Sequence, residues 1–150
     1  MSTEPMKRVF NVGLAVDWGT LYWQQKWDGT IVLGGYRGRD FDAESTSTED
    51  VNPRIQSALE TFLPSAFPDL PPITVAARWA GIMDQTPDNK PIVGQWPTGS
   101  NTWVIAGFGG HGLPPALGVT EALANSIGNR ILSAELDALS PARFSAVVSA

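Results

Sequence analysis

The sequence contains no cysteine and a single histidine, His111. The lack of cysteine excludes disulfide bridges, thiolate metal ligands, thiol nucleophiles and cysteine-linked cofactors. With one histidine and no cysteine, we expect no metal site. Ten Lys and Arg stand against fifteen Asp and Glu, which gives a net charge of −5, and the basic residues form no block. This pattern argues against electrostatic binding to nucleic acid or to an anionic membrane.

Long apolar runs are also missing. No stretch approaches the roughly 20 apolar residues of a membrane span. The first ten residues lack the apolar core of a signal peptide. We therefore expect a cytoplasmic protein without a membrane partner. The composition that remains is globular, with 43% hydrophobic and 17% charged residues in 150, the size of one ordinary domain.

Local patterns in the first half predict a hairpin and a helix. Asp28-Gly29 lies between two β-prone runs, which is a strong hairpin signal because both residues tolerate turn conformations. Residues 37–50 are polar and predict a surface loop. A helix is predicted from about 52 to 63, capped by Asn52 and ended by Pro64. Its apolar stripe consists of Val51, Ile55, Leu59 and Phe62.

The second half predicts strands followed by a longer helix. Residues 73–83, 91–94 and 102–106 have the pattern of strands, and residues from about 114 to 133 have a helical pattern. The order of these elements favours an α+β fold, with a mixed, largely antiparallel sheet and two main helices, over a regular βαβ series.

A glycine-rich segment, Gly107 to Gly112, joins the last strand to the last helix. Glycines allow close approach of a ligand to the backbone, and the free N–H groups of a helix start favour an electron-rich group. The G-x-G-x-x-G spacing also permits an NAD(P)-binding reading. However, no acidic residue at the end of a parallel strand follows about 20 positions on. His111 is either an ordinary loop residue or a pocket group beside a bound ring.

Three ordered blocks resemble one known family. The run 78–94 resembles the W-x-G-x-x-x-x-T-x-D-x-x-P-x-x-G signature of FAD-dependent amine and amino-acid oxidoreductases, the family of D-amino acid oxidase, glycine oxidase and sarcosine oxidase. Residues 106–112 resemble its final flavin-contacting loop, and residues 22–35 resemble the strand pair of its substrate domain. The resemblance covers about residues 3–145.

The resemblance implies non-covalently bound FAD and the oxidation of an amine or amino acid by hydride transfer to flavin. It implies a substrate-binding part at about residues 9–100 and a flavin-contacting strand–loop–helix at about 101–135. By residue, the implied cofactor contacts are Gly107, Phe108, Gly109, Gly110, His111, Gly112 and Leu113. The implied substrate-side residues are Trp79, Met83 and Tyr22.

The sequence also departs from this family. Members begin with a dinucleotide-binding segment that has no counterpart upstream of Val9, and residues 2–5 resemble the linker that follows it. We therefore expect the C-terminal portion of such an enzyme, and little FAD binding or activity from the chain alone. The sequence leaves open whether it is a natural truncation, an incomplete gene model, or one subunit of a split enzyme with a separate dinucleotide-binding chain. The remaining alternative is a non-catalytic remnant or interaction module with the same fold.

Two substrate-side positions differ as well. Amino-acid oxidases of the family carry an arginine where this chain has Met83, and the sarcosine-oxidase type carries a lysine where it has Pro114. Loss of the arginine removes a bidentate carboxylate clamp. An amine is therefore as reasonable a substrate as an amino acid, and Arg78 is the one candidate to replace the clamp.

Overall fold

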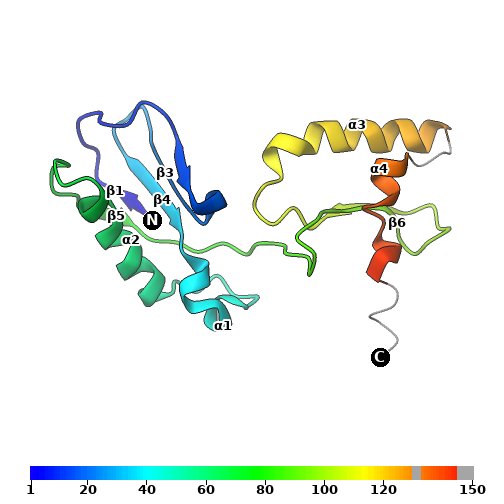
Figure 1. Cartoon of the computed structure of the whole chain (residues 1–150), viewed down its shortest axis with the longest axis horizontal. Coiled ribbons are helices and arrows are strands. Elements are labelled where there is room, and N and C mark those ends of the chain that lie inside the picture. The colour runs from blue at the N-terminus through cyan, green and yellow to red at the C-terminus, as the bar shows by residue number, and fades with distance from the viewer. Residues whose placement is uncertain (130–132, 145–150) are drawn as a thin grey trace. The chain divides into compact units, whose positions relative to one another are not determined.

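The computed structural model describes residues 1–129 and 133–144. The chain divides into two compact units, Met1–Ile82 and Met83–Ala150. Both units combine helices with antiparallel strands (Figure 1). This confirms the predicted α+β fold class. The functional division predicted near residue 100 remains a prediction.

The first unit is built on a five-stranded antiparallel sheet in the order β2-β3-β4-β1-β5. The predicted hairpin is present, since Lys26 N–H donates to the Thr30 carbonyl at 2.8 Å and Gly29 has a φ of +88°. Alternate residues of β3 are buried, so one face of the strand points into the core. The strands are β1 Ser2–Thr3, β2 Leu14–Val16, β3 Leu21–Gln25, β4 Ile31–Gly35 and β5 Val75–Ala77.

The structure differs from the sequence analysis at two strands of this unit. Ser2–Thr3, for which the sequence predicted no strand, form β1, which pairs with both β4 and β5, and the Thr3 hydroxyl accepts the Ile31 N–H at 3.1 Å. The strand predicted over 73–83 is only β5, Val75–Ala77. Its neighbour β1 is two residues long, so the chain beyond Ala77 has no strand to pair with.

The helix α2, Pro53–Ala66, covers the sheet and buries Ile55, Leu59 and Leu63 in the core (Figure 1). Asn52 caps it as predicted, with its side chain accepting the Arg54 N–H at 2.9 Å. Pro64 does not end the helix. It lies in the exposed last turn, where one lost backbone bond is tolerated, and the helix continues to Ala66.

The predicted polar loop at 37–50 is partly helical. It contains the 3₁₀ turn η2, Arg37–Asp40, and the short helix α1, Phe41–Glu44; a further 3₁₀ turn, η1, spans Asp17–Gly19. The Asn52 amide donates to Asp40 at 3.0 Å and to Glu44 at 2.9 Å, which fixes these turns to the start of α2.

The second unit contains a two-stranded antiparallel sheet and a long helix. Strand β6, Ile92–Gln95, pairs with β7, Trp103–Ala106. Helix α3, Leu113–Asn129, is followed by α4, Ala134–Asp137, and the 3₁₀ turn η3, Pro141–Phe144. The predicted end of the long helix at 133 was wrong, because Ser133 caps α4 instead; residues 130–132 lie outside the described residues. Val93, Leu123 and Leu136 form the core of this unit.

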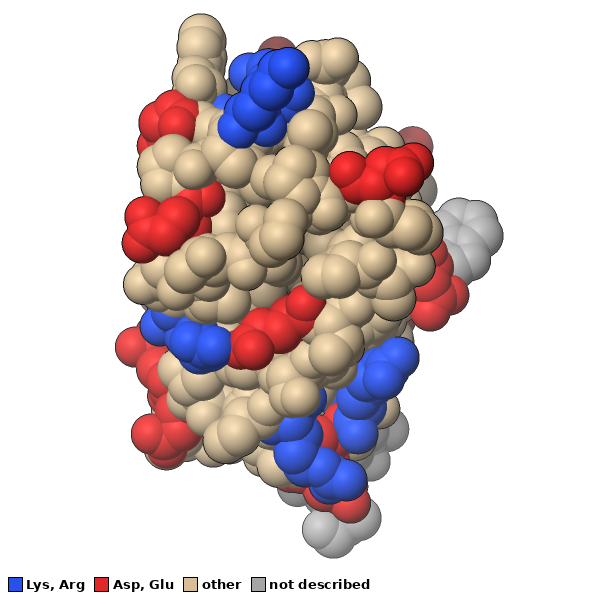
Figure 2. All heavy atoms as spheres, turned by 90° about the vertical axis from the view of Figure 1, so that its left-hand side faces the viewer, with Lys and Arg blue, Asp and Glu red and all other residues tan. Residues whose placement is uncertain are grey.

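Within the described residues, no helix is long and apolar enough to cross a membrane. On the face shown in Figure 2, acidic and basic side chains are interspersed with neutral surface and form no large patch of one sign.

Candidate functional site

The glycine loop between β7 and α3 has a backbone that only glycine adopts readily. Gly107, Gly109 and Gly110 have φ angles of +74°, +57° and +88°. Side chains other than glycine are strained in this region of conformational space. The glycines predicted to admit a ligand are therefore also required by the path of the chain.

Three N–H groups of this loop are bonded within the unit. Gly107 N–H donates to Asp84 Oδ2 at 2.5 Å, and Gly109 N–H donates to the Asp84 carbonyl at 2.9 Å. His111 N–H donates to the Phe108 carbonyl at 3.0 Å. The loop is thus tied to the segment that leads from Met83 to Thr86.

Other N–H groups of the loop remain available. The described residues offer no acceptor to the N–H groups of Phe108, Gly110, Gly112 and Leu113. Pro114 and Pro115 follow in the first turn of α3 and carry no N–H. These unpaired donors adjoin the N-terminus of a 17-residue helix, whose dipole is positive at that end. The arrangement favours an electron-rich or anionic group.

The loop packs directly on the segment 83–86. A Cβ added to Gly110 would lie 2.2 Å from Met83 Cε, and one added to Gly107 would lie 2.6 Å from Thr86 Cγ2. Both distances are far shorter than a real contact. Met83 and Thr86 therefore form the floor beneath the glycines, and larger residues at 107 or 110 would displace the loop.

Arg143 supports this floor from a distant part of the sequence. Its Nε donates to Asp88 Oδ2 at 2.9 Å, and its other nitrogens donate to carbonyl oxygens that include Lys90 at 2.8 Å. The Thr86 hydroxyl donates to the same Lys90 carbonyl at 2.8 Å. Hydrogen bonding from Arg143 holds the pKa of Asp88 well below its usual range. No sequence pattern pointed to Arg143, because it acts across 55 residues.

Comparison of the sequence and the fold with known proteins identifies the family of this chain. A sequence model of the FAD dependent oxidoreductase family matches residues 2–126. The chain belongs to this family. Its fold is also similar to that in the crystal structure of L-proline dehydrogenase from P. horikoshii, with a TM-score of 0.75 and 24% sequence identity. That match covers 96% of this chain but 38% of the dehydrogenase chain, so this chain spans well under half of its length.

The cofactor of this family is FAD, and the loop residues fit a flavin. The isoalloxazine ring of a flavin presents acceptor atoms on its pyrimidine edge, and the unpaired N–H groups of the loop are donors suited to them. The exposed, side-chain-free surface at Gly110 leaves room for close approach of a flat ring.

The structure brings together some of the predicted site residues. Met83 and the whole loop from Gly107 to Leu113 lie in one unit and are in contact through Gly110. His111 is exposed and bonds through its backbone. Tyr22 and Trp79 belong to the other unit. Both are about half exposed, and the Tyr22 ring lies over Gly34.

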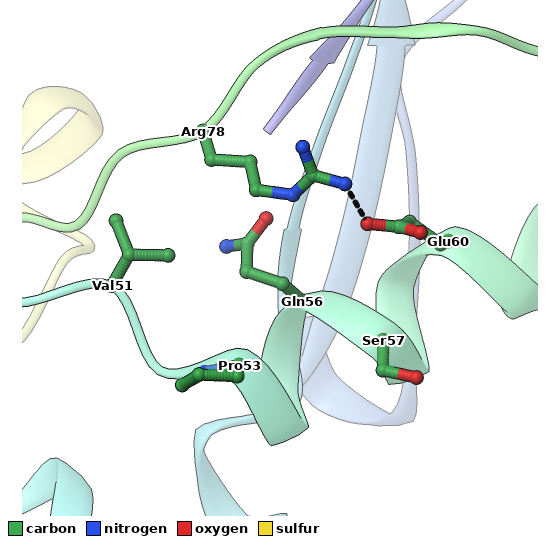
Figure 3. Close-up of a pocket in the computed structure, with 6 residues that line it drawn as sticks. All are labelled: Val51, Pro53, Gln56, Ser57, Glu60 and Arg78. Atoms are coloured by element: carbon green, nitrogen blue, oxygen red, sulfur yellow. Dashed lines mark hydrogen bonds and ion pairs between the residues drawn. The ribbon is translucent and has the colours of Figure 1, made fainter.

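Arg78 does not have a free guanidinium. It lies after β5 and pairs with Glu60 of α2 across an open hollow of about 260 Å³ (Figure 3). The hollow is lined by Val51, Pro53, Gln56, Ser57, Glu60 and Arg78. This ion pair argues against the alternative in which Arg78 replaces the missing carboxylate clamp.

Proposed function

We propose that the chain supplies the substrate-binding and flavin-contacting part of an enzyme that oxidises an amine or an amino acid with FAD. The observation that carries this proposal is that four N–H groups next to the start of α3 have no acceptor within the described residues, those of Phe108, Gly110, Gly112 and Leu113. When bound, FAD supplies the acceptor for a hydride from the carbon next to the amine nitrogen, and the resulting imine is hydrolysed by water.

The loop's proposed role is to hold and orient the flavin. Its N–H groups donate to the electron-rich edge of the ring, and the positive end of α3 stabilises negative charge there. Gly109, Gly110, Gly112 and Leu113 provide contact through the backbone alone. The exposed imidazole of His111 is the candidate pocket residue, able to donate or accept a proton near neutral pH.

On the substrate side, Met83 lies beneath Gly110. Tyr22 and Trp79, whose side chains are about half exposed, are proposed as substrate-side residues from the family resemblance alone. With a thioether at position 83 and Arg78 paired to Glu60, the chain lacks the bidentate carboxylate clamp described above. We therefore place amines, including bulky ones, beside amino acids as substrates.

A dinucleotide-binding partner, in the same or a separate polypeptide, completes the proposal. Helix α3 leaves Leu117 and Ile127 exposed, and Leu113 at its start is 91% exposed. Such a set suits a protein partner. Leu123 does not belong to this exposed set, since it is 5% exposed and packs with Val93.

The test is a fusion of this chain to the dinucleotide-binding segment of a complete member of the family. The Met1 nitrogen donates to the Leu33 carbonyl at 2.8 Å, and a peptide N–H can keep this bond after fusion. We expect a yellow protein whose flavin absorbance is bleached anaerobically by at least one amine or amino acid in a panel. A fusion that binds flavin but is reduced by none of them would instead support the non-catalytic alternative.

The unfused chain is the matched control. Each backbone hydrogen bond to the flavin contributes roughly 0.5–1.5 kcal/mol net, whereas immobilising a ligand costs an estimated 4–15 kcal/mol. We expect weak or undetectable FAD binding by the chain alone, measured by quenching of flavin fluorescence. Tight binding by the unfused chain would mean that the cofactor site is misassigned.

A further inference from the structure

We propose that Asp84 is the positioning residue of the glycine loop and that its charge tunes the cofactor held there. The tuning of the cofactor rests on the proposed function, whereas the positioning of the loop does not. Asp84 bonds the loop through two different atoms, with Oδ2 accepting from Gly107 and the carbonyl oxygen accepting from Gly109. The nearer of these partners is 23 residues away in the sequence.

The two hydrogen bonds accepted by Asp84 decide which N–H groups of the loop are left without an acceptor in the protein. A segment with this many glycines has wide conformational freedom, so its shape must be imposed by bonds from outside it. Asp84 takes the N–H groups of Gly107 and Gly109, and those of Phe108 and Gly110 remain available to a ligand. Asp84 therefore accounts for the alternation of bonded and unbonded N–H groups from Gly107 to Gly110.

The charge of Asp84 has a second consequence. A carboxylate that accepts a 2.5 Å bond from Gly107 places a negative charge against the peptide that begins the loop. This charge opposes the positive end of α3 at the same site. A reduced, more electron-rich ring is thereby disfavoured relative to the oxidised ring, so Asp84 lowers the tendency of the bound cofactor to accept electrons.

Position 84 is one of the variable positions of the family signature. The fixed residues of that pattern in this chain are Trp79, Gly81, Thr86, Asp88, Pro91 and Gly94. The neighbouring residue, Met83, contacts Gly110. Positions 83 and 84 thus both support the loop. Met83 makes an apolar contact with it, and Asp84 accepts two of its hydrogen bonds.

The first test uses the full, unfused chain and needs no cofactor. Amide hydrogen exchange of Gly107 and Gly109 is measured by NMR in the wild type, Asp84→Ala and Asp84→Asn. In Asp84→Ala we expect Gly107 to exchange at least tenfold faster, because its acceptor is lost, and Asp84→Asn to restore slow exchange. Asp137→Asn is the control, since this exposed carboxylate in α4 makes no side-chain hydrogen bond within the described residues.

The second test uses the FAD-loaded fusion protein. Asp84→Asn keeps an acceptor for Gly107 but removes the charge, so we expect a more positive reduction potential than in the wild type or Asp137→Asn. A merely structural role would leave the potential of Asp84→Asn unchanged, and that result would overturn the tuning. Gly107 exchange in Asp84→Ala within twofold of wild type would overturn the positioning role. Failure of the fusion to bind FAD would instead contradict the proposed function.

Discussion

The two units of this chain are held together in different ways. In the first unit, buried apolar side chains from β3, β4 and α2 pack into one cluster that includes Trp23, Leu33 and Leu59. In the second unit, the core around Val93 and Leu123 is smaller. There, much of the loop structure depends on hydrogen bonds that Asp84 and Asp88 accept, the latter from Arg143.

This difference predicts that substitutions in the two units affect stability and ligand binding differently. A packed apolar cluster tolerates few changes in volume but makes no demands on individual polar groups. A loop held by single hydrogen bonds can present its backbone to a ligand, but each bond matters more. The candidate site lies in the unit of the second kind, so polar substitutions there should affect binding more than they affect the fold of the first unit.

The largest expected effect comes from the apolar core of the first unit. Leu33 is almost wholly buried, and Leu33→Ala should lower the free energy of unfolding of this unit by about 2–5 kcal/mol through lost contacts and a cavity. Urea titration followed by amide signals of each unit measures this. Leu117→Ala, at an exposed position of α3, is the control and should change stability by less than about 0.5 kcal/mol. Equal losses of unfolding free energy in Leu33→Ala and Leu117→Ala would contradict the assignment of the first unit's stability to its apolar core.

A buried amide in the first unit tests the comparison further, because it is a polar group beside the apolar core. Gln25 accepts N–H groups from Val9 and Phe10 and donates to carbonyls that include Gly29, at 2.8, 3.1 and 2.9 Å. Gln25→Leu leaves buried backbone groups without partners and should cost about 1–3 kcal/mol. The same titration measures it, and the exposed neighbour Gln24→Leu should have little effect. A neutral Gln25→Leu would mean that water replaces the amide.

The glycine loop should show an effect on binding together with a smaller one on stability. Gly110→Val forces a β-branched residue into a φ of +88° and against Met83, at a cost of about 1–2 kcal/mol for the backbone conformation alone. In the fusion protein we expect the flavin spectrum to be lost. Gly118→Val is the matched control, because a Cβ there meets nothing within 4 Å. Normal FAD binding by Gly110→Val would move the cofactor away from the loop.

The smallest expected effect concerns pH. The pKa of Asp88 in the folded chain lies below its ordinary value of 3.8, so at low pH the unfolded chain binds the proton more readily. The ion pair with Arg143 therefore stabilises the second unit above about pH 4, and this contribution is lost as the pH falls further. Thermal unfolding at pH 7, 5 and 3 should show a smaller acid-induced loss in Asp88→Asn than in the wild type or Asp137→Asn. Parallel losses in all three would show that the pair contributes nothing.

The sequence predicted those parts of the fold that depend on neighbouring residues. The Asp28-Gly29 hairpin and the Asn52 cap were found because their signals lie within a few residues of the structure they cause. The glycine loop was found for the same reason. Strand β1 was missed because two residues carry no periodicity, and its partners Val32 and Ala77 are distant in the sequence.

The same distinction applies to the site. The loop glycines and Met83 were predicted, whereas Asp84 and Arg143 were not, because their partners are far away in the sequence and each is a single ordinary polar residue. Side-chain burial is a further limit of sequence reasoning. Trp27, Trp79 and Trp96 are exposed although tryptophan is large and largely apolar, since hydrophobicity alone does not say which face of an element is covered.

The hydrogen bonds that the glycine loop makes within the protein have a consequence for the association rate of the proposed cofactor. Gly107, Gly109 and His111 have acceptors within the protein before any ligand arrives. The loop is therefore preorganised, and a flavin bound there, as proposed above, would need no rearrangement of the backbone. Association should then be limited by diffusion and orientation rather than by a conformational step, and differences in affinity among loop variants should appear mainly in the dissociation rate.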